Sequence, residues 1–354
     1  MAFTPQSRTT ARPGRPVADP ANWTAADLGG DRSWIHELTD GEVADLRAAG
    51  RAALDVAGGD PTRLTGIGRD GFDLGRFALP LARIRRELKD GPGLALIRGL
   101  PVGTPDGQDM PEAECAAIFW GIGRHLGKAI SNNPDGDLIG HVHDTGKSYD
   151  DPNVRGYQTA VTMDYHCDQA ELVALFCLRT AMEGGLSKVA SSVAVYNTLL
   201  SLRPDLVEAL MQPLCWTKHG EADPAQQPWY ESPVFAFKDG LLCTAFGPKH
   251  IEKGHALPGA PALTSAQAEG LRLAEEIAEA QHLSMELRPG DIQILNNEVM
   301  LHTRTGFTDW PEPARRRHLW RLWLAAPDIR PATEYILQWR RGVNVAETKT
   351  RIAL

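Results

Sequence analysis

Apolar positions recur along the first third of the chain at two spacings, one typical of helices and one typical of strands. A capping-box spacing from Thr39 to Glu42 precedes a helical apolar pattern, and similar patterns recur at residues 77–88 and 111–127. Between the last two, the short apolar run at 93–100 is closed by Gly and Pro, which predicts a strand. The pattern therefore predicts packing helices around the first strand of a sheet.

Runs rich in β-branched and aromatic residues dominate the rest of the chain. Such runs follow at short intervals over residues 156–196, and others at 285–325 are expected to close the sheet. Between them, helix-like stretches alternate with a hairpin candidate at 235–246, whose turn is an Asp-Gly pair. We interpret residues from about 193 to 282 as an insert over a barrel or sandwich.

Length and composition indicate a globular protein. The 354 residues are 42% hydrophobic and include 25 Pro and 34 Gly, which suits a turn-rich chain with a sizeable core. We predict a single domain over residues 21–354. Residues 1–20 are rich in Pro, Arg and Thr and lack an apolar face, so we expect them to be poorly ordered.

Charge and cysteine content restrict which binding partners and which cellular compartment suit this protein. The net charge is −8 and the basic residues are scattered, which disfavours nucleic acid as a partner. Five cysteines without C-x-x-C spacing indicate neither a disulfide framework nor a zinc knuckle, and they suit a reducing cytoplasm. The chain shows no signal-like start and no apolar run of about 20 residues, so we expect neither secretion nor membrane spanning. We expect a small-molecule substrate, and a homo-oligomer stays open.

One His-x-Asp motif stands in a strand-like context. Side chains two positions apart on a strand share a face, so His166 and Asp168 can bind one metal while Cys167 points away. His302 follows a predicted turn and strand far along the chain and is the third candidate. Two histidines and one carboxylate occupy one face of a ferrous ion and leave the other face open. The three residues therefore predict an iron site.

Two other interpretations of the histidines stay open. His302 taken alone could be a buried histidine with a structural role. His141 and His143, followed by Asp144, could hold zinc, but their Gly, Asp and Lys neighbours indicate a loop without a fourth ligand. The linked pattern favours the iron site.

An arginine-rich segment near the C-terminus predicts an anion site. Arg317, Arg321 and Trp323 fall on one face of a period-two strand. An exposed edge strand protected by charge is the alternative. Apolar neighbours favour burial, and a buried guanidinium demands an anion whose geometry its planar fork can match, such as a carboxylate. A dicarboxylate cosubstrate would supply that partner.

Several short motifs over residues 150–326 form a spaced set that is more specific than any one of them. They are Tyr165-His166-Cys167-Asp168, Gly184-Gly185-Leu186-Ser187, Gly290-Asp291, Asn296-Asn297, His302-Thr303-Arg304 and Arg317-His318-Leu319-Trp320-Arg321. Together they resemble the taurine dioxygenase/TfdA family of iron(II)- and 2-oxoglutarate-dependent oxygenases. The resemblance implies a mainly β fold with helical additions (α+β), a distorted double-stranded β-helix or jelly roll similar to clavaminate synthase, with a helical insert between its halves.

The resemblance also implies the cofactors and the reaction. It implies iron(II) on the His166, Asp168 and His302 side chains, with 2-oxoglutarate held by Arg317 and the Ser187 hydroxyl. It places Arg321 against the cosubstrate or an acidic substrate. With O2, such an enzyme oxidises, by default hydroxylates, an unactivated C–H bond of a small or medium-sized acidic or amino-acid-derived substrate and releases succinate and CO2.

Other reactions and other classes of protein remain alternatives. Desaturation, cyclisation and epoxidation would use the same cofactors. A zinc-dependent hydrolase could use the same three ligands, but it leaves Arg317 and Ser187 unexplained. A non-catalytic ligand-binding barrel would not need the full ligand set.

Candidate substrate-lining residues come from loops at about 130–160 and from the insert, because function is carried by loops on a shared fold. The candidates are Asn132, Asn133, Gln158, Tyr165, Glu171, Trp229, Tyr230 and Asn297, together with Arg321. For the aromatic residues among them, packing in the core is the alternative role. For an isolated acid such as Glu171, the alternative is a solvent-exposed carboxylate at the end of a strand.

Overall fold

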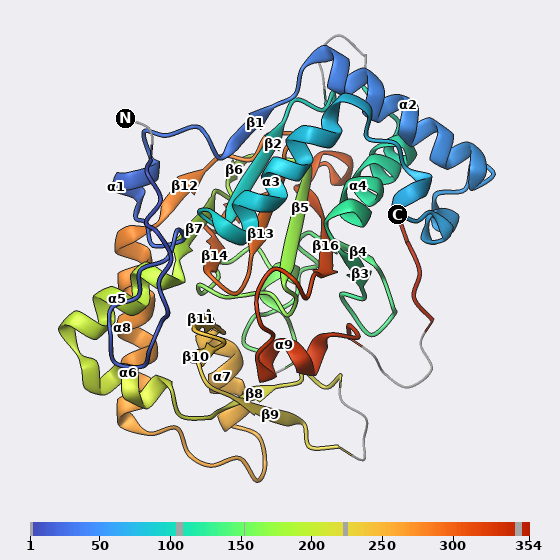
Figure 1. The fold of residues 1–354 in the computed structure, drawn as a ribbon. Helices are drawn as coiled ribbons and strands as arrows, with labels where there is room; N and C mark the ends of the chain where they lie inside the picture. The colour runs from blue at the N-terminus through green and yellow to red at the C-terminus, as the bar shows by residue number, and fades with distance from the viewer. Residues whose placement is uncertain (1–2, 104–108, 152, 222–225, 344–348) are drawn as a thin grey trace.

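The computed structural model describes residues 3–103, 109–151, 153–221, 226–343 and 349–354. A larger sheet crosses the centre of the molecule, with helices covering its outer face (Figure 1). The larger sheet has the strand order β1 (Ile35–Glu37), β2 (Leu94–Arg98), β13 (Ile292–Asn296), β5 (Leu172–Arg179), β16 (His318–Ala325) and β3 (Lys128–Ile130), with β4 (Ile139–Val142) also paired to β16. All neighbours are antiparallel except β1 and β2.

A smaller sheet carries part of the site. It has the order β12 (Leu283–Met285), β7 (Ser187–Ser191) and β14 (Met300–Arg304), all antiparallel. Apolar residues of the two sheets join one core cluster, including Val173 and Leu319 from the larger sheet and Val189 and Leu301 from the smaller. Two packed antiparallel sheets with alternating inward residues are the jelly-roll arrangement that the resemblance implies.

The N-terminal helices cover the face of the larger sheet that points away from the smaller sheet. They are α2 (Asp40–Val56), α3 (Ala78–Asp90) and α4 (Glu112–Leu126) (Figure 1). The capping box predicted from Thr39 to Glu42 is present at the start of α2. Phe119 of α4 lies against Phe176 of β5, with ring centroids 5.5 Å apart, and Phe176 contacts Trp320 of β16. Full burial of each aromatic side chain contributes about 1.5–3 kcal/mol, so this layer anchors β5 and β16.

The insert leaves the smaller sheet after β7 and returns at β12, the neighbour of β7. Ser191 caps its first helix by accepting a hydrogen bond from the Ala194 amide. The Asp239-Gly240 turn has φ of 51° and 74°, which suits the predicted hairpin. The insert comprises α5 (Ser192–Leu202), α6 (Pro204–Leu210), β8 (Leu214–Thr217), β9 (Trp229–Ser232), β10 (Phe235–Lys238), β11 (Leu241–Thr244), α7 (Pro248–His255) and α8 (Ser265–Gln281). It therefore contains two hairpins as well as helices.

The N-terminal segment differs from the sequence expectation of poor order. Residues 3–20 form no helix or strand, yet the Val17 amide donates to Asn197 Oδ1 at 2.7 Å. Asp19 is buried between Arg8 and Arg330, at 3.0 and 2.9 Å. These partners are distant in sequence, so the composition of the segment does not reveal them.

Short elements complete the fold. They are α1 (Ala25–Leu28), β6 (Glu183–Gly184), β15 (Phe307–Thr308), α9 (Glu334–Trp339) and the 3-10 helices η1 (Pro61–Gly66), η2 (Arg69–Gly71), η3 (Gly75–Phe77), η4 (Gly156–Gln158) and η5 (Pro313–Arg315). Tyr335 of α9 donates from its hydroxyl to the Cys167 carbonyl at 2.8 Å, so the C-terminal helix supports the segment between His166 and Asp168.

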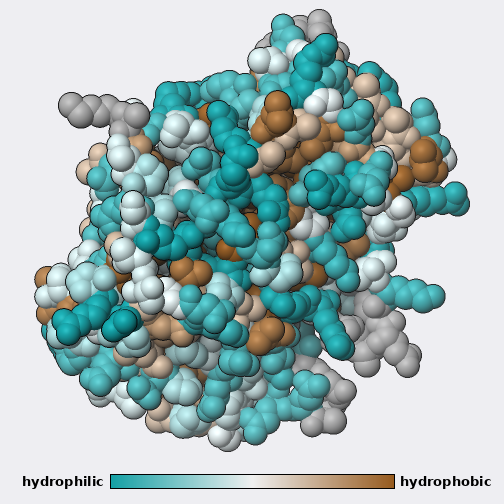
Figure 2. All heavy atoms as spheres, viewed as in Figure 1, coloured by the Kyte–Doolittle hydropathy of each residue, from teal (hydrophilic) through white to brown (hydrophobic). Residues whose placement is uncertain are grey.

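The surface and the cysteines carry few special features. The face seen in Figure 2 is mostly hydrophilic, with apolar residues in small separate groups. Among the described residues, the helices are all too short or too polar to cross a bilayer. All five cysteines are buried with free thiols.

Candidate iron and 2-oxoglutarate site

The two candidate histidines face each other across a single antiparallel bridge. The His166 amide donates to the His302 carbonyl at 3.0 Å, and the His302 amide donates back at 2.9 Å. Directly paired residues project their side chains to the same side, and these two ring centroids lie 4.3 Å apart. Backbone pairing therefore brings together two residues that are remote in sequence.

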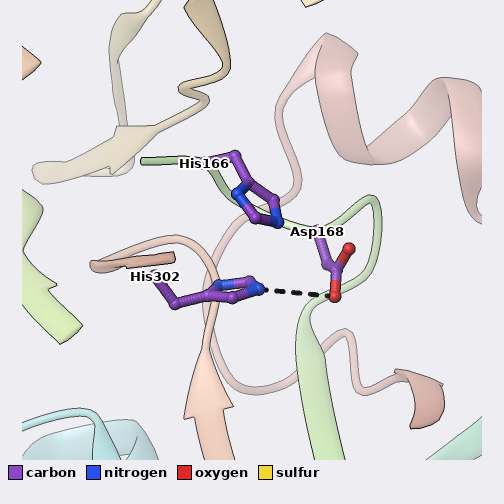
Figure 3. Close-up of side chains that lie close together, drawn as sticks. All are labelled: His166, Asp168 and His302. Atoms are coloured by element: carbon purple, nitrogen blue, oxygen red, sulfur yellow. Dashed lines mark ion pairs between the residues drawn. The ribbon is translucent and has the colours of Figure 1, made fainter. Parts of the chain in front are cut away.

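The predicted strand at residues 156–168 is wrong apart from this bridge. The Cys167 amide donates to the Phe246 carbonyl at 2.8 Å, and the Asp168 amide donates to Asn297 Oδ1 at 3.1 Å. Because these partners replace a ladder, the segment runs as a loop. Asp168 nevertheless reaches the side on which both imidazoles lie, as Figure 3 shows.

The three candidate ligands converge in a buried cluster. Each offers one ligand atom within 4.8 Å of the others, and His302 Nε2 lies 3.7 Å from Asp168 Oδ2 (Figure 3). The exposed fractions of His166, Asp168 and His302 are 8%, 5% and 7%. Across the described part of the chain, this is the one group of three or more His, Cys, Asp or Glu side chains close enough to share an ion.

The polar atoms of the cluster fit a divalent metal. Asp168 Oδ2 is buried and has no hydrogen-bond partner among the described residues, an arrangement that costs free energy unless a cation satisfies it. His166 Nδ1 lies 3.0 Å from the Asp164 carbonyl, which can only accept, so Nδ1 carries the proton. The lone pair of His166 Nε2 is thereby left for a metal.

The electrostatics favour the protonation states that a metal needs. Burial raises the pKa of Asp168, but Arg321 and the two imidazoles outweigh this and hold it at about 2. Burial, followed by the neighbouring His166, lowers the pKa of His302 to about 3. At neutral pH the site therefore presents a carboxylate and a neutral imidazole, the forms that bind metal.

Arg321 orients the carboxylate. Its Nη1 donates to Asp168 Oδ1 at 3.0 Å, and its Nε donates to Asn132 Oδ1 at 2.9 Å. The guanidinium also lies over the rings of Tyr157 and Trp323, 4.7 and 4.6 Å from their centroids. With Oδ1 engaged, Asp168 keeps Oδ2 for a metal.

A second buried arginine lies in the same cavity. Arg317 is 7% exposed, and its guanidinium has no carboxylate partner among the described residues. Burial lowers the pKa of Arg317, as expected for a cation that lacks a full counterion. An anionic ligand would supply that counterion.

Ser187 lies on the same cavity wall. Its Oγ accepts from Gln293 Nε2 at 2.9 Å, which leaves its own O–H free to donate to a ligand. The space between the cavity walls, counted together with the open solvent at its mouth, is about 510 Å³. Its lining residues are Val142, Tyr157, Met163, His166, Asp168, Leu175, Ser187, Leu287, His302, Thr303, Arg304, Arg317, Leu319 and Arg321.

The other residues predicted to contact substrate lie outside this lining. Asn132 accepts from Arg321, and Asn133 donates to Asp137 at 2.8 Å. Gln158 Oε1 accepts from the Arg155 amide at 3.3 Å. These side chains hold loops in place.

The remaining candidates also have structural partners. The Tyr165 hydroxyl donates to Glu279 at 2.7 Å, and Glu171 accepts from Arg340 at 2.6 Å. Trp229 lies in the β8–β9 hairpin, and the hydroxyl oxygen of Tyr230 accepts from Trp339 at 3.0 Å. Asn297 holds the Asp168 amide and so acts on the metal side of the site.

The sequence reasoning missed eight of the fourteen lining residues, among them Arg304, Tyr157 and Met163. Arg304 shares the face of His302 on β14, so the period-two rule could have found it. Tyr157 and Met163 lie on a loop, and no local pattern distinguishes them from other loop residues.

The competing histidine cluster is a hydrogen-bonded chain. His141 Nδ1 lies 2.8 Å from His318 Nε2, and His318 Nδ1 lies 3.0 Å from Arg179 Nη2. The arginine can only donate, so His318 donates onward to His141. This arrangement engages both ring nitrogens of His141, one of the two histidines that a zinc ion would need, whereas His143 Nδ1 has no hydrogen-bond partner among the described residues.

Comparisons with known proteins agree with the fold and with the family that the sequence resembles. A profile of the "Taurine catabolism dioxygenase TauD, TfdA family" matches residues 60–323. "FR-33289 synthase" of Streptomyces rubellomurinus is 30% identical over 351 residues, covering 95% of this chain and 98% of that protein. "Uridine-5'-phosphate dioxygenase" of Amycolatopsis sp. is 27% identical over 250 residues, covering 66% of this chain and 86% of that protein.

Solved structures share the fold. A structure of asparagine oxygenase with Fe(II), 2S,3S-3-hydroxyasparagine and succinate has a TM-score of 0.65 at 21% identity, covering 88% of this chain and 100% of that one. A structure of the non-heme iron oxygenase OrfP with Fe and alpha-ketoglutaric acid has a TM-score of 0.58 at 17% identity, covering 82% and 93%.

Proposed function

The chain belongs to the taurine dioxygenase (TauD/TfdA) family of iron(II)- and 2-oxoglutarate-dependent oxygenases, and from that premise we propose that it hydroxylates a C–H bond of a small acidic substrate. The balanced reaction converts substrate, 2-oxoglutarate and O2 into hydroxylated substrate, succinate and CO2. One observation carries the proposal: a buried ligand trio with an unpartnered carboxylate oxygen shares its cavity with an arginine that lacks a carboxylate.

The iron ligands in this proposal are His166, Asp168 and His302. Iron(II) with 2-oxoglutarate and O2 supplies the oxidising chemistry, while the protein supplies binding and orientation. The trio leaves open coordination positions for cosubstrate and O2, as two histidines and one carboxylate do in this class of site. Arg321 keeps Asp168 ionised and directs one oxygen to the metal.

The proposed 2-oxoglutarate partners are Arg317 and Ser187. A guanidinium donates two parallel hydrogen bonds to a carboxylate, and the Ser187 hydroxyl has a free proton for the same group. Gln293 supports this by donating to Ser187 and thereby fixing the direction of that proton. Both groups lie in the cavity that contains the iron ligands.

The charge of the cavity supports an acidic substrate. Three arginines, at 304, 317 and 321, line it, and Asp168 is the one carboxylate among the lining residues. Once 2-oxoglutarate has neutralised part of this charge, positive potential remains for a second anion. The similar proteins asparagine oxygenase and uridine-5'-phosphate dioxygenase are, by their names, enzymes of small polar molecules.

The alternatives receive less support. A zinc hydrolase does not account for the family match or for Arg317, and a silent binding barrel does not account for the buried ligand trio. Desaturation, cyclisation and epoxidation use the same residues, so the product decides among them. Five buried free thiols support a reducing compartment such as the cytoplasm.

The test is an anaerobic titration followed by a turnover assay. Iron(II) and 2-oxoglutarate added to the apoprotein should give a weak visible charge-transfer band, and zinc in place of iron should give none. Succinate release is then measured across a panel of small carboxylic acids, amino acids and phosphorylated compounds, with turnover without substrate as the baseline. A flat spectrum would reject the oxygenase assignment.

A further inference from the structure

Residues 156–163, here called the wall loop, carry Tyr157 and Met163 into the cavity beside the iron ligands. Hydrogen bonds from a backbone amide and a hydroxyl group hold this loop against the end of β14. The Phe307 amide donates to the Ala160 carbonyl at 3.0 Å, and the Thr303 hydroxyl donates to the Met163 carbonyl at 2.6 Å. The wall loop is thus one side of the space that a substrate would enter.

The Arg304 side chain donates hydrogen bonds to backbone carbonyls of the wall loop from the cavity side. Its Nη2 donates to the carbonyls of Gly156, at 3.4 Å, and Thr159. Its Nη1 donates to the Val161 carbonyl and, at 3.3 Å, to that of Thr305. Both terminal nitrogens therefore bridge pairs of carbonyls, and three of the four carbonyls belong to the wall loop.

The chemistry of these partners explains why an arginine is needed. Thr159 is the C-cap of the 3-10 helix η4, and carbonyls at the C-terminal end of a helix lack partners within it. The Gly156 carbonyl also accepts from the Thr159 amide at 3.1 Å, so Arg304 adds a further donor there. Arg304 is 6% exposed, and among the described residues it has no carboxylate partner, so these carbonyls compensate its charge. A lysine has one nitrogen and cannot span the same acceptors with a planar fork.

We propose that Arg304 is a positioning residue that fixes the substrate wall relative to the iron. His302 and Arg304 stand two positions apart on β14 and share its cavity face. One strand therefore holds both an iron ligand and the anchor of Tyr157 and Met163. The inference rests on the proposed function, because it assigns to the wall loop the task of holding the substrate carbon near the metal.

A second clamp in the preceding segment provides a matched control. Lys253 of α7 donates from Nζ to the carbonyls of Tyr149, Asp151 and Val154, at 3.1, 2.7 and 3.1 Å. It holds its segment by the same cation–carbonyl chemistry, but residues 149–151, 153 and 154 are not among the lining residues of the cavity. Loss of this clamp should loosen these residues and leave the hydrogen bonds from Arg304 to the wall loop in place.

The first arm of the experiment needs no substrate. Hydrogen–deuterium exchange is measured on the iron- and 2-oxoglutarate-loaded protein for the native chain, Arg304→Lys and Lys253→Gln. Arg304→Lys keeps the charge beside Arg317, so the visible 2-oxoglutarate band should keep its position and midpoint. Exchange in the peptide containing 156–163 should rise about tenfold, because its amides lose local protection. Unchanged exchange there would overturn the proposal.

The second arm uses the panel acid that most stimulates succinate release by the native enzyme. Arg304→Lys should raise the KM for this acid about tenfold and lower the ratio of oxidised product to succinate, with the KM for 2-oxoglutarate unchanged. A merely structural role would lower the active fraction and leave both KM values and the ratio as they were, which would contradict the proposal. Equal uncoupling in Lys253→Gln would also contradict it. If no acid stimulates turnover, the proposed substrate class fails while the exchange arm still decides the role of Arg304.

Discussion

The two sides of the cavity are built in different ways. The side proposed to hold iron and cosubstrate rests largely on strands: His302 lies on β14, Ser187 on β7 and Arg321 on β16, with Arg317 directly before β16. The other two proposed iron ligands, His166 and Asp168, lie on a loop that one backbone bridge ties to β14. The substrate side is the wall loop, which is held by side chains that donate to its carbonyls. A ladder fixes position through many backbone bonds, whereas the loop depends on a few side chains. The chemistry can therefore stay constant while the wall changes with the substrate.

The largest effect is expected from removing the anion partner on the strand side. Arg317→Ala should weaken 2-oxoglutarate binding about 100-fold, because a charge-assisted pair contributes about 1.5–3 kcal/mol. The midpoint of the visible band under anaerobic titration measures this. Arg315→Ala is the control, since Arg315 is 53% exposed and stacks on Trp310 outside the cavity. Equal midpoints for native protein and Arg317→Ala would disprove the assignment.

Replacement of Arg321 tests whether the strand side of the cavity also positions the metal. Arg321→Gln should weaken iron(II) binding about tenfold, because groups that orient a metal ligand contribute about 10–100-fold in affinity. Iron titration monitored by the intrinsic fluorescence of the protein provides the readout. Unchanged iron affinity together with a raised KM for an acidic substrate would instead place Arg321 in substrate binding, as the family resemblance implies.

Ser187 should have a smaller effect on 2-oxoglutarate binding than Arg317. Ser187→Ala removes one hydrogen bond from a neutral hydroxyl to a carboxylate, for which we expect about 1.5 kcal/mol, or roughly tenfold in affinity. Ser187→Thr keeps the hydroxyl and should restore native affinity in the same titration. Equal losses in both variants would mean that packing at this position, and not the hydroxyl, determines binding.

The last prediction concerns stability instead of binding, at the turn between β13 and β14. Glu298 is 1% exposed, and burial raises its pKa to about 8. Between its ordinary value near 4.5 and about 8, the folded protein holds a proton that the unfolded chain releases. Its contribution to stability is therefore complete below about pH 4.5 and is lost as the pH rises through 8.

Glu298→Gln should remove this pH dependence. Urea unfolding of the apoprotein at pH 5 and pH 8 gives the free energy of unfolding for native chain and variant. The fall in that free energy between the two pH values should be smaller in the variant. An equal fall would assign the pH dependence to other groups and leave Glu298 without a role in it.

Part of the candidate site was visible in the sequence. The spacing of His166 and Asp168, taken with His302, predicted the cluster that the structure brings together, because a short motif is a local property of the chain. The choice of Arg317 as the cosubstrate partner came from the family resemblance and stays a prediction. The capping box at Thr39 was also local.

Only the tertiary structure decided the wall, the N-terminal segment and the loop course of residues 156–168. Each depends on hydrogen bonds between residues far apart in the chain, such as Arg304 to Thr159, Val17 to Asn197 and Cys167 to Phe246. Such bonds follow from where the sheets and the insert place a donor, and local periodicity carries no information about that placement.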